Sequence, residues 1–355
     1  MKTHYDFVFL TNTPSFYKLN LCRELSKRHS LLLVLLGYGI EAVNQVPERE
    51  PFDVVFLHEG DLHRRNPFRV FFRLLKLMRR IRATRVLFSG WFVPEFNVYA
   101  FLSPRRKNAL ICESSVLDSS LSGIKGLIKR SIISRMSAAL PSGIPHRELF
   151  ERAGFRGSIH PTGGVGLIRY THRTSRTHTH RPLRYLFIGR LIAVKNVVAL
   201  AQEFKRNGQP LTIVGSGPLE PDIRRLHAPN ITLTGFVPNE QLPELFRRHD
   251  IFILPSLYEP WGLVVEEALY HGLPVLASQH VGCARDLIIP GDTGELFNPK
   301  EPDSLTQAMQ RIEQHYAHYR NKVLSIPWEQ RKMQQIQAYS GLVAPLPASQ
   351  SKRTE

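Results

Sequence analysis

Two glutamates on either side of a glycine, in the segment Ser256–Ala268, have a spacing that suits a ligand with an anionic centre. Glu259 stands in a turn that contains Pro and Gly, and Glu267 follows eight residues later on a predicted helix. Gly262 precedes that helix, whose first N–H groups lack intrahelical acceptors and therefore attract anions. One carboxylate thus precedes an anion-binding helix start, and the other lies about two turns along the helix. A nucleotide sugar, which carries phosphates between two hydroxyl-rich sugars, is such a ligand.

Two cations stand after the predicted strand Arg184–Ile188. Gly189 ends the strand, and Arg190 and Lys195 follow five residues apart, in the loop and first turn of a predicted helix. A guanidinium donates to two oxygens at once and an ammonium is a compact charge, so together they are suited to neutralise a diphosphate. For the pair taken alone, solvated surface charges are the alternative.

Two further turns are predicted to lie near a nucleotide. Gly215 and Gly217 resemble part of a dinucleotide-binding fingerprint, but Glu220 occupies the place of its third glycine, so the sequence predicts only a tight strand-to-helix turn. Phe236 and Val237 join another predicted strand to a helix, and their backbone groups could read a base edge. A purely structural loop is an equally good interpretation there.

The composition favours two domains and an acidic partner. The chain has 355 residues, long for a single core, and a formal net charge of +17. Such a charge indicates an anionic membrane, a phosphate-rich substrate or nucleic acid, but no nucleic-acid module is recognisable and we expect no nucleic-acid partner. Cys22, Cys112 and Cys283 lack metal-ligand spacing and are predicted to be buried free thiols in a reducing cytoplasm.

The sequence predicts no bound metal, no cofactor and no membrane-spanning segment. The chain contains no Asp-x-Asp sequence, with which another large class of sugar-nucleotide enzymes holds a divalent cation. Basic side chains and helix N–H groups are expected to replace the metal, and a nucleotide sugar would be a substrate rather than a cofactor. No apolar run approaches the roughly 18 residues of a spanning helix, and the first residues lack a convincing signal-peptide core.

Short apolar runs alternate with helical patterns in both halves of the chain. This predicts an α/β protein with two Rossmann-like, doubly wound parallel-sheet domains that face a cleft, with ligands at the carboxyl ends of the strands. The predicted strands are Phe7–Leu10, Leu31–Leu36, Val54–Leu57, Val86–Phe88, Ala109–Cys112, Arg184–Ile188, Leu211–Val214, Ile231–Leu233, Ile251–Leu254 and Val275–Ala277. The predicted helices are Phe16–Arg28, Pro67–Ile81, Ile124–Met136, Val194–Arg206, Leu219–Leu226, Gln241–Arg247, Leu263–His271 and Asp303–His315.

The polar, basic stretch 171–182 interrupts this alternation and is interpreted as an interdomain linker. It separates an N-terminal domain, residues 1–170, from a C-terminal domain, residues 183–326. A helix at 327–342 is expected to pack back toward the N-terminal domain. Residues 343–355 are expected to form a disordered tail.

Several short motifs, taken in order, resemble those of retaining glycosyltransferases of the GT-B fold, family 4, of the kind that build bacterial surface polysaccharides. Each motif is weak alone, whereas the ordered set is specific, and the resemblance is close from Tyr185 to Asn298. The motifs are Gly-Arg-x4-Lys at 189–195, Gly-Ser-Gly-Pro at 215–218, Gly-Phe-Val at 235–237, Pro-Ser-x-x-Glu-Pro-Trp-Gly-Leu-x-x-x-Glu-Ala at 255–268 and Gly-x-x-Gly-x-Leu-Phe at 291–297.

The resemblance implies a role for each matching residue. Arg190 and Lys195 would bind the donor diphosphate and stabilise the charge of the leaving group, together with the backbone N–H groups of Gly262, Leu263 and Val264. The leaving phosphate itself would take the proton of the acceptor, so the family mechanism needs no dedicated base.

The same resemblance implies a different role for each of the two glutamates. Glu267 would accept hydrogen bonds from the ribose hydroxyls, and Glu259 would hold hydroxyls of the transferred sugar near its anomeric carbon. A glycosidase acid and nucleophile pair is disfavoured, because two carboxylates about two helical turns apart are far separated for the retaining geometry.

The resemblance also implies that the N-terminal domain binds the acceptor. The loop that follows the first strand, together with the start of the next predicted helix, offers Ser15, Tyr17 and Lys18. Many family members carry a His after a middle strand of this domain, and this chain has Glu113 at the comparable place. Glu113 is therefore a candidate for contact with substrate, with a structural role as the alternative.

The predicted helix at 67–81 accounts for much of the net charge. Arg69, Arg73, Lys76 and Arg80 fall on one stripe of it, beside large apolar residues. Such a helix can lie on an anionic membrane with its apolar side partly inserted. The alternative is a helix that packs its apolar side on the sheet and leaves its basic residues in water.

These observations predict a metal-independent, retaining glycosyltransferase, peripheral at the cytoplasmic face of a membrane. It would move a hexosyl or N-acetylhexosaminyl group from a nucleotide-diphosphate sugar to a lipid-linked, oligosaccharide or polysaccharide acceptor in cell-surface glycan or lipopolysaccharide biosynthesis. The alternatives are a sugar-nucleotide epimerase or isomerase on the same fold, and a non-catalytic basic protein that binds membrane or nucleic acid.

Overall fold

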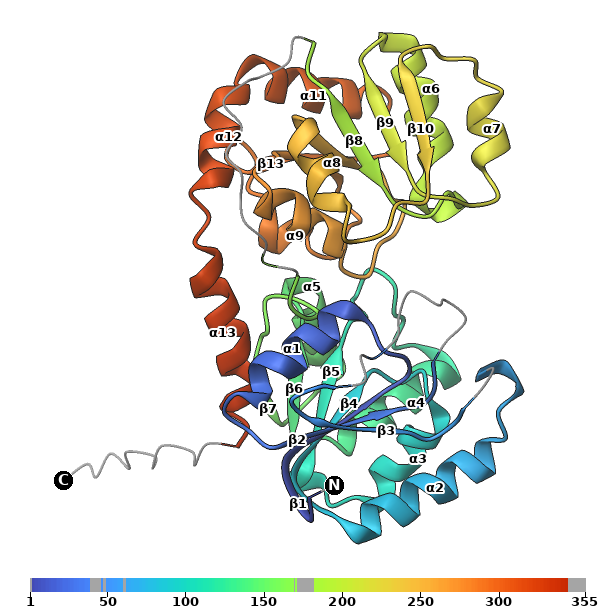
Figure 1. Cartoon of the computed structure of the whole chain (residues 1–355), viewed down its shortest axis with the longest axis vertical. Helices are drawn as coiled ribbons and strands as arrows, with labels where there is room; N and C mark the ends of the chain where they lie inside the picture. The colour runs from blue at the N-terminus through green and yellow to red at the C-terminus, as the bar shows by residue number, and fades with distance from the viewer. Residues whose placement is uncertain are drawn as a thin grey trace, which may run out of the picture. The chain divides into compact units, whose positions relative to one another are not determined.

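The computed structural model describes most of the chain, and these residues form two compact units, each built on its own parallel sheet (Figure 1). Within the described residues, no helix combines the length and apolarity needed to cross a membrane. The described residues are 2–38, 46, 49–59, 62–168, 170 and 182–343, without the side chain of residue 63. The first unit comprises 1–142, 146–167 and 329–355, and the second comprises 143–145 and 168–328.

Two predicted segments fall on residues that are not described. The predicted linker at 171–182 lies outside the described residues except for Pro182. The predicted tail at 343–355 lies outside them except for Val343.

The first unit contains a seven-stranded sheet in the order β3-β2-β1-β4-β5-β6-β7, with every neighbouring pair parallel. The strand order reverses direction between β1 and β4, which makes the sheet doubly wound and opens a crevice at their carboxyl ends. The strands are β1 His4–Thr11, β2 Leu31–Leu35, β3 Asp53–Phe56, β4 Arg82–Ser89, β5 Asn108–Cys112, β6 Ala138–Pro141 and β7 Ser158–Ile159. The helices are α1 Phe16–Ser26, η1 Leu62–Arg64, α2 Pro67–Arg80, α3 Pro94–Leu102, η2 Arg105–Lys107, α4 Gly123–Ser134, α5 Ile144–Arg152 and α13 Trp328–Ser340.

The second unit repeats this plan with six parallel strands in the order β10-β9-β8-β11-β12-β13. Here the order reverses between β8 and β11, so the carboxyl ends of these strands flank the expected ligand position. The strands are β8 Tyr185–Ile188, β9 Leu211–Val214, β10 Ile231–Gly235, β11 Ile251–Leu254, β12 Val275–Ser278 and β13 Gly294–Phe297. The helices are η3 Ala193–Lys195, α6 Val197–Asn207, α7 Glu220–Arg224, α8 Leu242–Arg248, α9 Leu263–Tyr270, α10 Ala284–Leu287, α11 Ser304–Gln314 and α12 Tyr316–Leu324.

Fully apolar runs correspond to strands that are buried on both faces. All residues of β2, β5, β11 and β12 are buried, as expected when helices cover both sides of a parallel sheet. The structure has the predicted alternation of strands and helices, but the sequence prediction missed helices α3, α5, α10 and α12. Strands β6, β7 and β13 escaped the sequence prediction, because β7 has only two residues, β6 ends in a Pro and β13 begins with a Gly, and Pro and Gly weaken a strand pattern.

Two predicted helices have different boundaries in the structure. Lys195 ends the short helix η3, and Asn196 adopts a left-handed conformation with φ of 55° before α6 begins, so the prediction of one helix from Val194 was wrong. Asn is one of the few residues that tolerate this conformation. The helix predicted to end at His315 continues, after a break there, as α12.

The last helix, α13, is counted with the first unit apart from its first residue. Its Lys332 ammonium lies 3.8 Å from the Glu24 carboxylate on α1, and Ser340 pairs with the His29 ring at 2.8 Å. Tyr339 is fully buried. The core of the first unit is thus completed by residues from the far end of the chain.

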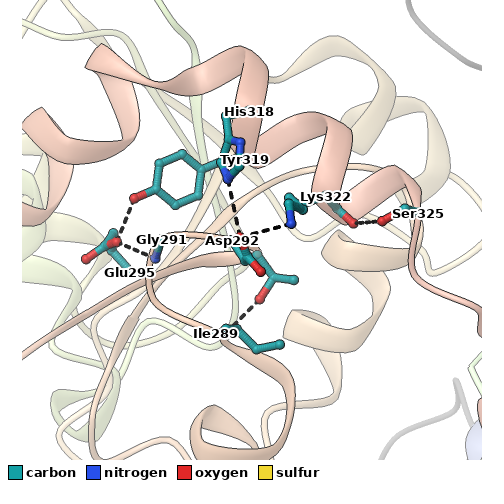
Figure 2. Close-up of polar contacts among 9 residues, drawn as sticks. Ile289, Gly291, Asp292, Glu295, His318, Tyr319, Lys322 and Ser325 are labelled. Atoms are coloured by element: carbon teal, nitrogen blue, oxygen red, sulfur yellow. Dashed lines mark hydrogen bonds and ion pairs between the residues drawn. The ribbon is translucent and has the colours of Figure 1, made fainter.

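A buried carboxylate holds the motif at 291–297 in the second unit. Glu295 accepts hydrogen bonds from the Tyr319 hydroxyl at 2.6 Å and from the Gly291 N–H at 2.9 Å (Figure 2). The Arg311 guanidinium donates to its other oxygen at 2.8 Å. Burial opposes the charged form, but these donors outweigh it and lower the pKa of Glu295 from its ordinary value. This part of the motif therefore serves the fold.

Candidate functional site

The loop after β11 carries Glu259 and is held in place by backbone hydrogen bonds to the loop after β12. The Glu259 N–H donates to the His280 carbonyl at 3.2 Å, and the Glu259 carbonyl accepts from the Gly282 N–H at 2.9 Å. Ser256, earlier in the loop, is fully buried. Because its backbone is tied on both sides, Glu259 has a defined position at the carboxyl edge of the sheet.

Glu259 and Lys195 form an ion pair across this edge. Lys195 Nζ donates to Glu259 Oε2, and the two side chains are only 14% and 16% exposed. The Ser256 hydroxyl lies 3.5 Å from the same carboxylate oxygen, and the Leu257 N–H donates to the Val194 carbonyl at 2.8 Å. A charge pair that is largely shielded from water is electrostatically stronger than one on the surface. The structure thus brings together two of the three predicted catalytic residues.

The start of α9 fits an anion site in its backbone geometry. Gly262 has φ of 92°, and a Cβ added there would stand 2.8 Å from the Val281 side chain. Leu263 and Val264 follow as the first residues of the helix and are half-buried. The N–H groups of a first helical turn point away from the helix without intrahelical acceptors.

The two adjacent glutamates of α9 have different environments. Glu266 is buried, and its carboxylate accepts a hydrogen bond from the Trp261 indole N–H at 3.3 Å. Glu267 is half-buried. Sequence spacing singled out Glu267, and the structure gives the neighbouring Glu266 a role in the fold that the sequence reasoning missed.

The loop after β8 carries Arg190 and touches the glycine turn after β9. Arg190 is exposed, and the Leu191 N–H donates to the Ser216 carbonyl at 2.9 Å. A Cβ at Gly215 would stand 1.9 Å from the Gly189 carbonyl oxygen, and one at Gly217 would stand 2.5 Å from the Leu191 carbonyl oxygen. Close backbone approach between the two loops therefore accounts for both glycines, whether or not a nucleotide binds beside them.

Phe236 and Val237 follow β10 at the same edge of the sheet. The Phe236 side chain is 59% exposed, and Val237 is half-buried. The Gly235 carbonyl, one residue earlier, accepts a hydrogen bond from the Gly215 N–H at 2.8 Å. An exposed aromatic ring beside backbone groups is a suitable surface for a base.

The predicted residues of the second unit therefore gather at one edge. Adjacent parallel strands present their carboxyl ends together, and β10, β9, β8 and β11 are consecutive in the sheet. The loops that follow these strands carry, in that order, Phe236, Gly215, Arg190 and Glu259.

In the first unit, Lys18 is a buried charge with several protein partners. Its ammonium lies 3.1 Å from Glu113 Oε1, 3.2 Å from the Ser89 hydroxyl and 3.4 Å from the Thr11 hydroxyl. These partners stand at or just after the carboxyl ends of β5, β4 and β1. Burial opposes the charged form of Lys18, yet the Glu113 carboxylate, with a further contribution from the Tyr17 side chain, raises its pKa. The sequence reasoning named Lys18 and Glu113 separately and did not anticipate that they pair.

Two tyrosines lie close to this ion pair. The Tyr17 ring centroid is 5.6 Å from the Lys18 ammonium, and burial raises the pKa of Tyr17. Tyr339, from α13, also has its pKa raised by burial and by the charge of Glu113. Its hydroxyl has no hydrogen-bond partner among the described residues. Ser15, the remaining candidate of this unit, precedes α1 and is half-buried, and the Leu19 N–H donates to its carbonyl at 3.0 Å.

The thiols and possible metal ligands do not suggest another chemistry. Cys22, Cys112 and Cys283 are free and buried. Burial, with carboxylates nearby, raises the pKa of Cys283 well above its usual range, so this thiol is protonated and a poor nucleophile. In the described part of the chain, no group of three or more His, Cys, Asp or Glu residues has a geometry that could hold a metal ion.

Comparison with known proteins finds relatives for the second unit. Residues 169–323 match the family model described as "Glycosyl transferases group 1". An uncharacterized glycosyltransferase of Methanocaldococcus jannaschii is 32% identical over 138 residues, which make up 36% of this chain and 35% of that protein. A GDP-mannose-dependent alpha-mannosyltransferase of Mycobacterium tuberculosis is 33% identical over 149 residues, 40% of this chain and 38% of that protein. The alignments thus span little more than a third of these relatives.

Similarity in three dimensions extends over nearly the whole chain. The crystal structure of Anabaena HepE in complex with UDP-glucose has a TM-score of 0.74 and 17% sequence identity, and the match covers 96% of this chain and 99% of that one. Identity this low establishes the fold alone. It confirms the predicted class of two Rossmann-like, parallel-sheet domains.

Proposed function

Because residues 169–323 carry a glycosyl transferases group 1 domain and the chain has the GT-B fold, we propose that this protein is a glycosyltransferase. The resemblance to GT-B glycosyltransferases inferred from its motifs is confirmed at the level of the domain at 169–323 and of the fold. The observation that carries the proposal is the shielded Lys195–Glu259 ion pair, which lies at the same sheet edge as Arg190 and the start of α9.

We propose that this edge binds a nucleoside diphosphate sugar. Arg190, Lys195 and the N–H groups of Gly262, Leu263 and Val264 would contact the diphosphate, because each supplies positive charge or a donor.

The two ends of the donor would then lie against different side chains. Glu259 would accept hydrogen bonds from hydroxyls of the transferred sugar, and Glu267 would accept them from the ribose. Backbone groups of Phe236 and Val237 would face the base. Since Lys195 and Glu259 pair in the described structure, donor binding would exchange their mutual contact for contacts to phosphate and sugar.

The proposed reaction breaks the bond between the anomeric carbon and the phosphate oxygen. A new bond forms from the acceptor oxygen to the same face of the anomeric carbon, and the leaving diphosphate takes the acceptor proton. Negative charge grows on the diphosphate as the bond breaks, and Arg190 and Lys195 would stabilise that charge. In this proposal side chains supply the positive charge that a divalent metal supplies in other transferases.

The acceptor would be a lipid-linked or saccharide chain bound by the first unit. Tyr17 and Glu113 are the candidates for contact with it, together with Ser15, because the Lys18 ammonium already has Glu113, Ser89 and Thr11 as partners. Lys18 would position Glu113 rather than bind the acceptor. A lipid-linked acceptor agrees with the net charge of +17, which favours a location at the cytoplasmic surface of an anionic membrane.

A thermal-shift panel of UDP-, GDP- and ADP-sugars tests the proposal. One class of nucleotide should raise the unfolding temperature by several degrees when it saturates the site, because a ligand that binds only the folded state stabilises it. The stabilising nucleotide sugar, incubated with and without an acceptor, then separates transfer from epimerisation, which needs no acceptor. Absence of any shift across the panel would refute a donor site.

A further inference from the structure

Three successive helices of the first unit expose large apolar side chains that the sheet does not use. On α2, Phe68 and Phe72 are 76% and 65% exposed. The other exposed side chains are Val98, Phe101 and Leu102 on α3 and Ile124, Leu127 and Ile128 on α4. We name these eight residues the three-helix face.

The spacing on each helix shows that these residues form stripes rather than isolated exposures. They stand at i and i+4 on α2, and at i, i+3 and i+4 on both α3 and α4, which places them on one side of each helix. The core-facing side is made by other residues, such as Val70 and Leu74 on α2 and Ile133 on α4. A helix that serves only the core of its own domain needs a single apolar stripe.

The three helices are neighbours. Helix α2 contacts α3, and α3 contacts α4, so the exposed stripes lie on adjoining elements of one unit (Figure 1). Soluble monomeric proteins rarely expose large contiguous apolar patches, and such patches usually mark an interaction site.

The charge around the three-helix face is almost entirely positive. Residues 66–135 contain fourteen Lys or Arg residues and three Asp or Glu residues. Each of the three acidic residues already has a partner: Glu95 pairs with Arg65 at 2.8 Å, Glu113 pairs with Lys18 at 3.1 Å, and Asp118 accepts from the Ser115 N–H. Exposed Lys76 and Lys125 stand on the same helices as the apolar stripes.

We propose that the three-helix face docks on the surface of an anionic phospholipid bilayer. The apolar side chains would enter the boundary between head groups and acyl chains, and the flanking basic side chains would contact lipid phosphates. A second copy of the chain is a poorer occupant, because it would oppose one basic surface to another. This docking surface would account for the membrane location proposed above, and docking does not depend on the transfer reaction.

Flotation of the full chain with lipid vesicles tests this inference, in the absence of sugar nucleotide and acceptor. The protein should bind vesicles that contain phosphatidylglycerol and phosphatidylcholine, and should bind pure phosphatidylcholine at least about tenfold more weakly. The variant Leu127→Ser/Ile128→Ser should lose about tenfold in affinity for the anionic vesicles. Ile289→Ser is the matched control, because Ile289 lies in the second unit and is 56% exposed, against 55% for Ile128.

A charge series completes the test. Lys76→Gln/Lys125→Gln should weaken binding and reduce its dependence on salt, whereas Lys205→Gln, an exposed site in the second unit, should do neither. Equal binding to neutral and anionic vesicles, or an equal loss in Ile289→Ser, would overturn the proposal. So would a stable dimer in sedimentation that Leu127→Ser/Ile128→Ser dissociates. Nucleotide-sugar binding, measured separately on the same variants, should remain unchanged, so that failure of membrane docking is distinguished from failure of the donor site.

Discussion

Lys195 and Glu259 stand 64 residues apart in the chain, and their side chains meet at the edge of the second sheet. Each side chain is more than four-fifths shielded from solvent, and the ion pair limits the conformations that either side chain can adopt. Donor binding would replace this contact, and Lys195, already shielded at the sheet edge, would then face the negative charge that develops on the leaving diphosphate. Lys18 and Glu113 form a comparable pair in the first unit.

Replacement of Lys195 tests its proposed part in the reaction. Lys195→Ala should lower kcat about 10²-fold at saturating donor, because the leaving diphosphate loses a cation that acts in the transition state. Lys195→Arg should recover part of the rate, and Lys205→Ala, on the exposed side of α6, should be neutral. The measurement is steady-state kinetics together with donor titration by calorimetry. Normal turnover in Lys195→Ala, with only weaker donor binding, would contradict the assignment.

At the scale of elements, the loops that follow β8, β9 and β10 in the second unit contact one another through their backbones. The turn after β9 passes so close to the loop after β8 that Gly215 and Gly217 leave no room for a side chain. The carbonyl of Gly235 after β10 binds the Gly215 N–H from the other side. The loop that carries Arg190 is therefore positioned by backbone contacts with its neighbours.

Gly215→Ala should destabilise the protein by more than about 2 kcal/mol, because its Cβ would collide with the Gly189 carbonyl oxygen. Gly208→Ala is the matched control. Gly208 also has positive φ, at 72°, but nothing lies within 4 Å of its Cβ position, so only the conformational strain of about 1 kcal/mol should appear. Urea unfolding measures both. Equal losses in the two variants would contradict the close-approach explanation.

The carboxylate of Glu295 links β13 to α11 and α12, and its contribution should depend on pH. Glu295→Gln should lower the free energy of unfolding by about 2 kcal/mol at pH 7, because hydrogen bonds to a charged acceptor are lost. The folded state lowers the pKa of Glu295 from 4.5, so the stabilisation is present above that pH and disappears as the pH falls through the lowered value.

Urea unfolding of Glu295→Gln and the parent at pH 7 and at pH 4 checks this dependence. The difference between the two proteins should shrink at the lower pH. Glu329→Gln is the control, since the Glu329 side chain is 77% exposed. A difference that grows on acidification would show that the sign is wrong.

On the scale of the whole molecule, the two parallel-sheet units have separate cores. Helix α13, from the C-terminal part of the chain, packs with the first unit. Tyr339 of α13 is fully buried there without a hydrogen-bond partner for its hydroxyl among the described residues. Burial of an unsatisfied hydroxyl opposes stability, whereas burial of the ring supports it.

Tyr339→Phe should therefore leave stability unchanged or raise it by about 1 kcal/mol, and Tyr339→Ala should lower it by about 3 to 5 kcal/mol. Scanning calorimetry should place the loss in the transition of the first unit, while a bound nucleotide sugar should raise that of the second. Phe92→Ala, at a residue of the first unit that is 72% exposed, is the control. A loss of stability in Tyr339→Phe would show that the hydroxyl has a partner after all. A single unfolding transition that shifts both with the Tyr339 variants and with bound nucleotide sugar would contradict independent unfolding of the two units.

The sequence by itself determined the fold class and the edge at which the candidate site lies. Apolar runs that alternate with helical segments have few solutions other than doubly wound parallel sheets, and parallel strands bring their carboxyl ends together. Arg190, Gly215, Phe236 and Glu259 could be assigned to one edge for this reason, because each stands in the loop that follows a predicted strand.

Only the tertiary structure decided which of these side chains touch. The Lys195–Glu259 and Lys18–Glu113 pairs, and the burial of Tyr339, join segments tens to hundreds of residues apart, and no local pattern records such contacts. The same holds for the three-helix face. The sequence indicated an amphipathic basic helix at 67–81 and a second basic stretch at 125–135, whereas the apolar side chains that α3 and α4 leave exposed became visible only once the buried residues of each helix were known. Amphipathic periodicity shows that a helix has an apolar side, and packing alone decides which apolar side chains remain in solvent.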